Sequence, residues 1–376
     1  MTTHKETDIL IIGGGIAGCI AAISLVNHYN VILIDKLSEP KERIGESLAP
    51  AAQRILKQLD LLEGMQLFEK EELYVQNLGM QSYWGSEQVH IVDHLRNPDG
   101  LSKSLNRKAF ETYLRASAIK RGVQCIWPAK LYRSAFEANK WNVITTSDDH
   151  KEQCIKASFV IDATGRQSHF AKSLGIKRLH IDKLIACWAT LPNKEENKMS
   201  TISATENGWW YSAVVPNNKR ILAFQTDSDL IDRSAIKDLH AFIQLSKKNK
   251  QINQILEKNI DEITFQGTVA ANSTRLEQVI GQQWVALGDA AISFDPLSSQ
   301  GMFNAMASAQ QLKKLLTTSD IIYNHTPVKE AQFQETYTQQ INSIWDQYLY
   351  HKNLFYKAEM RWIEHPFWKR RQVRKS

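Results

Sequence analysis

The hydrophobic residues of this chain follow two different periods. Four short runs are almost wholly apolar, and each ends at a polar residue or a glycine: 8–12, 31–34, 158–162 and 284–287. Runs of that length bounded by turn residues predict buried strands. Apolar residues recur at helical spacing in three further segments: 20–26, 106–120 and the stretch that begins at 301. The alternation of strand and helix predicts an α/β fold.

Two segments rich in aromatic residues interrupt this alternation. Residues 73–96 are short and strand-like and contain Trp84, and residues 208–216 predict another strand. We therefore expect a Rossmann-type domain interleaved with a smaller β-rich substrate domain, followed by C-terminal helices. The predicted Rossmann-type domain takes residues 1–72, 101–190 and 265–325, the substrate domain takes 73–100 and 191–264, and the helical segment takes 326–376.

A glycine-rich turn joins the first strand to the first helix. Gly13, Gly15 and Gly18 fit the spacing G-x-G-x-x-G, and Asp35 ends the next strand about twenty residues later. Gly13 permits the tight turn, Gly15 lets the backbone approach a pyrophosphate, and Gly18 lets the helix pack on the strand. Asp35 would accept hydrogen bonds from ribose hydroxyls. This arrangement predicts a dinucleotide site, and both FAD and NAD satisfy it.

A polar loop enters the helix that begins at residue 301. Asp289 follows the preceding strand, and residues 298–300 are Ser-Ser-Gln. A helix N-terminus carries partial positive charge and unpaired N–H groups, which suit a polar, electron-rich ring. An ordinary strand-to-helix turn has the same pattern.

The helix that follows Pro50 has a charged approach containing Arg43, Glu46 and Ser47. Two interpretations are open: a capped helix with a charged approach, or a loop that places Glu46 and Ser47 beside a cofactor ring. Glu46 is the one candidate for a catalytic, proton-handling residue, because the sequence contains neither a nucleophile triad nor a metal-ligand cluster.

Composition narrows the class of protein. The 376 residues carry a formal net charge of +6, which is too mild to imply nucleic-acid binding. Four scattered cysteines predict free thiols in a reducing compartment, and hence a cytoplasmic protein. The apolar stretch 9–26 is interrupted by glycines, so a strand and a turn explain it better than a signal or membrane segment.

The order of four motifs resembles the flavoprotein monooxygenases of the hydroxybenzoate-hydroxylase fold. These motifs are the glycine fingerprint with Asp35, the helix start at Arg107, DATGR at 162–166 and GDAAISFDP at 288–296. GES at 45–47 and DPLSSQG at 295–301 look like the flavin-dependent halogenase branch. The resemblance implies FAD rather than NAD. The cofactor-binding residues that it implies are Gly13, Gly15, Ile16, Ala17, Gly18, Asp35, Lys36, Arg43, Ser47, Arg107, Asp289, Pro296, Ser299, Gln300, Gly301 and Met302.

Two departures argue against halogenation. Tryptophan halogenases carry W-x-W-x-I-P, whereas residues 208–216 read GWWYSAVVP, and the stretch 75–82 lacks the lysine that handles hypohalous acid. The segments GWWYSAVVP, SYWG and YKAEMRWIEHPFWKRR (356–371) look instead like the LodB-like flavoproteins. That resemblance implies oxygenation of a tryptophan in a precursor protein, on the way to cysteine tryptophylquinone.

The resemblance thus implies an FAD-dependent monooxygenase that hydroxylates a protein-borne indole through a flavin C4a-hydroperoxide. O2 would be the oxidant, and NAD(P)H or a flavin reductase would supply electrons. The partner would be the precursor of a quinone-cofactor oxidase or dehydrogenase, with no nucleic acid and no membrane. Trp84, Trp209, Trp210 and Tyr211 are the candidate substrate-binding residues. The alternatives are a monooxygenase or halogenase acting on a free aromatic molecule, and a non-catalytic flavoprotein chaperone.

Overall fold

Strand β1 (Thr3–Ile12) lies at the centre of an eight-stranded sheet in the computed structural model, which describes residues 3–67, 70–231, 238–257 and 262–372. Its parallel neighbours are β2 (Val31–Ile34) and β11 (Glu152–Asp162). The remaining strands of this sheet are β8 (Gln124–Ile126), β9 (Lys130–Glu137), β10 (Lys140–Thr146), β19 (Ile280–Gly281) and β20 (Trp284–Ala286). The parallel segments 9–12, 31–34 and 159–161 are apolar and buried, as expected where both faces of a sheet are covered.

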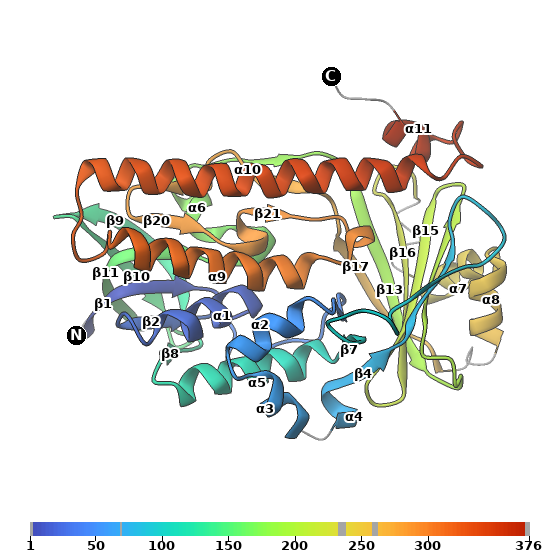
Figure 1. The fold of residues 1–376 in the computed structure, drawn as a ribbon, viewed down its shortest axis with the longest axis horizontal. Coiled ribbons are helices and arrows are strands. Elements are labelled where there is room, and N and C mark those ends of the chain that lie inside the picture. Colours follow the sequence, from blue (N-terminus) through green and yellow to red (C-terminus); the bar gives the residue numbers. More distant parts are fainter. Residues whose placement is uncertain (1–2, 68–69, 232–237, 258–261, 373–376) are drawn as a thin grey trace.

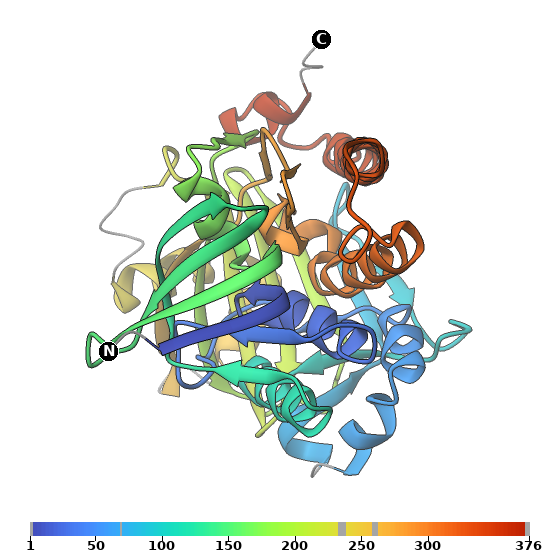
Figure 2. The same ribbon diagram turned by 90° about the vertical axis from the view of Figure 1, so that its left-hand side faces the viewer.

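Helices pack against this sheet and against one another. Helix α1 (Ile16–Leu25) is buried along its whole length and contacts α5 (Arg107–Lys120) and α9 (Gly301–Ser319). Helix α10 (Pro327–Lys357) runs beside α9, as Figures 1 and 2 show. The shorter helices are α2 (Ala52–Gln58), α3 (Leu62–Leu67), α4 (Lys70–Leu73) and α6 (His169–Ser173).

A seven-stranded sheet forms the second large unit, at the right of Figure 1. Its order is β17 (Thr264–Ala270), β13 (Leu184–Pro192), β16 (Lys219–Asp227), β15 (Gly208–Val215), β14 (Ser200–Thr205), β5 (Gly79–Tyr83) and β6 (His90–Asp93). Helices α7 (Leu239–Lys247) and α8 (Lys250–Glu257) pack on one face of this sheet. Two of its strands, β13 and β17, extend beyond the 191–264 interval that the sequence suggested for the substrate domain.

Two three-stranded sheets complete the fold around the large ones. One contains β3 (Ser47–Leu48), β7 (Ser102–Leu105) and β4 (Tyr74–Asn77), and β15 contacts both β4 and β7. The other contains β12 (Arg178–His180), β18 (Thr274–Leu276) and β21 (Ile292–Ser293). The 3-10 turns η1 (Gly165–Gln167) and η3 (Gly288–Ala290) follow β11 and β20 of the central sheet, and η4 (Pro296–Ser298) follows β21.

The C-terminal end of α10 reaches the seven-stranded sheet, where the short helix α11 (Pro366–Gln372) follows it (Figure 1). There Trp84, Trp209, Tyr356 and Trp368 form an aromatic cluster with edge-on ring contacts. The predicted α/β fold with C-terminal helices is therefore confirmed. None of the described helices is both long and apolar enough to cross a membrane. All four cysteines are free thiols.

Candidate functional site

Of the three fingerprint glycines in the turn between β1 and α1, Gly15 alone has free space around the position of a Cβ. Gly13 has φ +113°, and a Cβ there would lie 2.3 Å from the Ala163 carbonyl oxygen. A Cβ on Gly18 would lie 1.9 Å from the Gly13 carbonyl oxygen. A Cβ on Gly15 would meet no atom within 4 Å, and no side chain caps the first turn of α1. Unpaired N–H groups beside open space are what a pyrophosphate requires.

Asp35 holds the glycine turn from the end of β2. Its carboxylate accepts hydrogen bonds from the Gly14 N–H at 2.6 Å and the Leu37 N–H at 2.7 Å, and pairs with Arg115 at 3.1 Å. Arg115 also donates from Nε to the Gly14 carbonyl at 3.0 Å. The sequence analysis missed Arg115, although it follows Arg107 and Glu111 at intervals of four on one face of α5.

Arg43 and Arg107 meet at one buried carboxylate. Glu111 is only 1% exposed, and it accepts from Arg107 at 2.7 Å and pairs with Arg43 at 2.9 Å. Arg107 also donates to the Gly45 carbonyl at 2.7 Å, next to Glu46. Two guanidinium groups on one carboxylate leave an excess positive charge, which suits phosphate groups.

The structure brings Glu46 and Tyr211 together. Glu46 is 2% exposed at the start of β3, and its carboxylate accepts from the Gly45 N–H at 3.1 Å. Burial raises the pKa of the Tyr211 phenol well above its ordinary value, and the negative charge of Glu46 and a hydrogen bond with that carboxylate add to the rise. Ser47, the next residue, pairs with Ser104 of β7.

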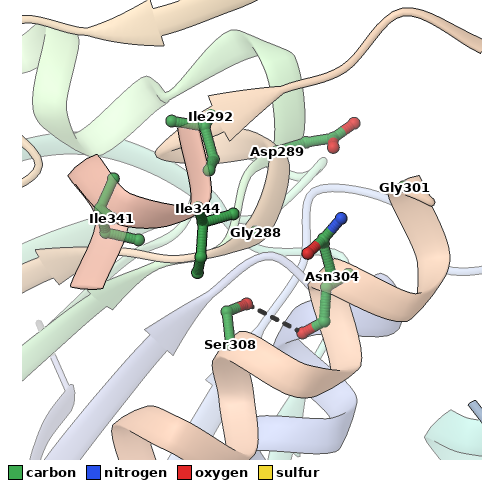
Figure 3. A pocket seen from close by; sticks show the side chains of 9 residues that line it. Gly288, Asp289, Ile292, Gly301, Asn304, Ser308, Ile341 and Ile344 are labelled. Atoms are coloured by element: carbon green, nitrogen blue, oxygen red, sulfur yellow. Dashed lines mark hydrogen bonds between the residues drawn. The ribbon is translucent and has the colours of Figure 1, made fainter. Parts of the chain in front are cut away.

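Asp289 and Gly301 line a common pocket with Asn304, which the sequence analysis missed. Figure 3 shows the Asp289 carboxylate pointing away from Ile341 and Ile344. It lies 3.8 Å from Arg166 of the DATGR motif, and its side chain is 41% exposed.

The predicted residues at the entry to α9 are exposed, except Met302, which like Gly301 already belongs to the helix. Pro296, Ser299, Gln300 and Gly301 lie at the surface, whereas Met302 is 7% exposed. No side chain caps α9, so the N–H groups of its first turn point out of the helix without an internal partner. This loop therefore presents backbone donors next to the pocket of Asp289.

The aromatic strand β15 divides its residues between two faces. Trp209 joins the aromatic cluster with Trp84, and Tyr211 packs against the same cluster. Trp210 instead packs with Phe224 and Phe242 beneath α7 and α8, and is 1% exposed. Because successive side chains in a strand alternate between faces, Trp210 lies away from the other three candidates.

Lys103 is a third residue that the sequence analysis missed. It lies on β7 opposite Gln76 of β4, is 7% exposed, and places its ammonium 4.7 Å from the Tyr74 ring. Burial lowers its pKa, and no carboxylate of the described residues pairs with it. A buried cation without an anion is costly and points to a functional role.

The profile of one protein family matches residues 8–90 and 100–376, and its description is tryptophan halogenase. The chain belongs to the tryptophan halogenase family. Its relatives include LodB of Marinomonas mediterranea, whose name assigns it to the FAD-dependent oxidoreductases; the two are 28% identical over 98% of each chain. The predicted resemblance to LodB-like flavoproteins is thus confirmed.

Two solved structures have the same fold as this family member. The flavin-dependent halogenase CmlS aligns with a TM-score of 0.84 and 21% identity, over 99% of this chain and 68% of CmlS. The peptidyl tryptophan dihydroxylase QhpG, described as essential for tryptophylquinone cofactor biogenesis, aligns with a TM-score of 0.78 and 20% identity, over 99% of this chain and 80% of QhpG. The prediction of a flavin-dependent oxidoreductase is confirmed by the family.

The residues present in this family member fit FAD. Gly15 leaves open space at the uncapped end of α1, Asp35 lies beside it, and the Arg43–Arg107 pair supplies positive charge nearby. Asp289 and the exposed N-terminus of α9 could receive the ribityl and ring portions. The individual cofactor contacts stay predictions.

Proposed function

We propose that this chain is an FAD-dependent monooxygenase that hydroxylates a tryptophan side chain of a partner protein during cysteine tryptophylquinone biogenesis. The observation that carries the proposal is the buried Glu46 carboxylate, held against the face of β15 that bears Trp209 and Tyr211. Membership in a family named for tryptophan chemistry, and the named activity of QhpG, support an indole as the substrate.

FAD would bind along the first turn of α1, between Asp35 and the loop before α9. Residues 13–18 with Lys36 would hold the pyrophosphate and adenosine portions, and Arg43 and Arg107 would balance phosphate charge. When reduced by NAD(P)H or a flavin reductase, the bound cofactor supplies activation of O2. With two electrons from the reductant, that chemistry would place one oxygen atom on the ring and release the other as water.

Glu46 would accept the proton that leaves the ring carbon after the new carbon–oxygen bond has formed, as the C–H electron pair returns to the ring. A carboxylate can serve as this base if it stays ionised and touches the substrate. The Tyr211 phenol would orient Glu46 through their hydrogen bond. The half-buried Trp84, which packs on the buried Trp209, would position the indole by ring contacts.

A protein-borne indole suits this surface better than a free amino acid. The stretches 81–85 and 208–216 contain no charged residue. A pocket for free tryptophan needs groups that pair with its ammonium and carboxylate, because burying unpaired charge is costly. An indole on a polypeptide needs only an open approach, so we propose the precursor of a quinone enzyme as the partner in the cytoplasm.

The test is co-expression with the candidate precursor, followed by mass spectrometry of its tryptophan peptide. We expect one or two added oxygen masses with the wild-type chain and none with Gly15→Val. Glu46→Gln should retain FAD but lose most of the modification, since an amide cannot accept the proton. Rapid hydroxylation of free tryptophan with an unmodified precursor would contradict the proposal.

Halogenation is the second candidate function, and Lys103 is the observation that favours it. We expect reduced FAD with bromide to give no halogenated indole, because the stretch 75–82 holds no lysine and the 208–216 spacing differs from the halogenase motif. Detection of a halotryptophan that disappears in Lys103→Met would establish the halogenase function instead. Consumption of NAD(P)H without partner would argue against a pure chaperone.

A further inference from the structure

A buried polar network lies beneath the loop that precedes α9. It consists of Asp182, Ser273, Asp295, Lys352 and Tyr356, which we call the Asp295 network. Its members come from four separate parts of the chain, and two of them lie on the last third of α10. The function described above assigns no task to these residues.

Asp295 is the residue of this network that belongs to the loop. It is 1% exposed and precedes η4, where one carboxylate oxygen accepts from the Leu297 N–H at 2.9 Å. The other oxygen accepts from the Tyr356 hydroxyl at 2.7 Å. The Tyr348 hydroxyl accepts from the Asp295 N–H at 2.8 Å. Side chains of α10 therefore bond both the backbone and the carboxylate of Asp295. The shape of η4 therefore depends on side chains of α10.

Lys352 compensates the charge of this network. Its ammonium donates to Asp182 and, at 2.6 Å, to the Ser273 hydroxyl, and it lies 3.9 Å from the Asp295 carboxylate. Burial raises the pKa of Asp295, whereas Lys352 opposes that rise. Arg371 also interacts electrostatically with both carboxylates, and the Tyr356 hydroxyl is a side-chain donor that bonds Asp295 directly.

Tyr356 also connects the loop to the aromatic cluster. Its hydroxyl accepts from Nε1 of Trp209 at 3.2 Å while donating to Asp295. Its ring lies 5.8 Å from that of Trp84. One hydroxyl thus touches both the strand that faces the proposed indole and the loop that faces the proposed cofactor ring.

We infer that Tyr356 is a positioning residue of the cofactor site. Its hydroxyl fixes Asp295, and through Asp295 the 295–301 loop, in the geometry that receives the flavin ring. The same hydroxyl ties that geometry to Trp209 in the substrate surface. The inference rests on the proposed function for the assignment of this loop to FAD, but the loop geometry itself can be measured without cofactor.

The experiment compares Tyr356→Phe with Tyr113→Phe. Tyr113 is a matched control, because its buried hydroxyl donates to the Leu61 carbonyl at 2.7 Å, in a different part of the fold. In the cofactor-free protein, the amides of residues 297–299 are hydrogen-bonded within the loop. Their hydrogen exchange should speed up about tenfold in Tyr356→Phe and stay unchanged in Tyr113→Phe, as expected for one lost buried hydrogen bond. The dissociation constant for FAD should rise by a similar factor only in Tyr356→Phe.

The outcomes distinguish the role of Tyr356 in the loop from the assignment of the loop to FAD. Faster exchange without a change in FAD affinity would leave the loop geometry correct but remove the loop from the cofactor site. Unchanged exchange and affinity, with only a lower melting temperature, would overturn the inference and make Tyr356 a purely structural residue. Trp209→Phe, which removes the Nε1 donor together with one ring of the buried indole, should lower stability and reproduce a smaller part of the Tyr356→Phe effect on loop exchange.

Discussion

At the scale of the residue, a substitution at Gly15 should affect cofactor binding without affecting folding. A Cβ at Gly15 meets nothing, whereas a Cβ at Gly18 would overlap the Gly13 carbonyl at 1.9 Å. Gly15→Ala should therefore change the free energy of unfolding by at most about 1 kcal/mol, the scale of a helix N-cap effect. It should nevertheless weaken FAD binding at least about tenfold, because the methyl group occupies the approach of the pyrophosphate.

The matched variant is Gly18→Ala, which we expect to destabilise the protein even without cofactor. Urea unfolding of the cofactor-free proteins and titration with FAD distinguish the two effects. Equal FAD affinity for Gly15→Ala and the wild-type chain would place the pyrophosphate elsewhere.

Lys103 offers a second residue-scale prediction. Its ammonium is buried without a carboxylate partner among the described residues, and burial lowers its pKa. Lys103→Met keeps the length of the side chain and removes the charge, so it should raise the free energy of unfolding by about 1 kcal/mol. Denaturant titration measures this change; a loss of stability would mean that the ammonium has a stabilising partner.

At the scale of the element, α5 carries more of the site than its sequence suggested. Glu111 binds Arg107 of the same helix and Arg43 of an earlier loop, and it is 1% exposed. Glu111→Gln leaves two guanidinium groups without their shared counter-charge. Since Arg43 is half-exposed, we expect a loss of about 2 kcal/mol, below the full cost of breaking a buried pair. Thermal and urea unfolding check this value, with Lys108→Gln on the exposed face of α5 as the control.

The sequence correctly predicted the elements in which a continuous apolar pattern marks the buried residues. The run 31–34 is β2 without any shift, and the predicted helix 106–120 is α5. The strand expected at 158–162 is the end of the longer β11, because its first half pairs with β1 and β10 through polar residues that break the apolar pattern.

Side-chain pairing between distant segments could not be predicted in the same way. Trp209, Trp210 and Tyr211 are consecutive in the sequence. The two-residue period of a strand places Trp210 on the opposite face from the other two, but the sequence does not say which face meets which cluster. The contact of Glu46 with Tyr211 joins β3 to β15, and no local pattern encodes it. Lys103 was overlooked because the prediction considered a lysine only within 75–82, whereas Lys103 lies on β7, which pairs with β4.

At the scale of the whole molecule, the proposed substrate surface is assembled from three distant parts of the chain. Trp84 comes from the loop after β5, Trp209 from β15 and Trp368 from α11, and the ring centres of Trp84 and Trp368 lie 5.2 Å apart. The C-terminal segment is tied down by the Trp368 indole, which donates to the Thr205 carbonyl at 2.7 Å, and by the ion pair of Arg371 with Asp227 at 2.7 Å. Helix α11 is therefore a structural wall of the surface.

Trp368→Ala should impair both the stability of the protein and the placement of the substrate. Trp368 is fully buried, so its truncation should cost about 3–5 kcal/mol of stability. It should also displace Trp84, against which it packs, and so reduce modification of the precursor at least about tenfold while FAD affinity stays near that of the wild type, since misplacing substrate by about an ångström has effects of this size.

The control is Phe242→Ala, because Phe242 is equally buried but packs with Trp210 on the opposite face of the same sheet. Both variants should lose similar stability, as measured by urea unfolding. At a temperature where both remain folded, only Trp368→Ala should impair hydroxylation of the precursor. Equal activity of the two variants would show that the aromatic cluster supports the sheet and does not position the indole, and the substrate surface would then have to be sought away from Trp84 and Trp209.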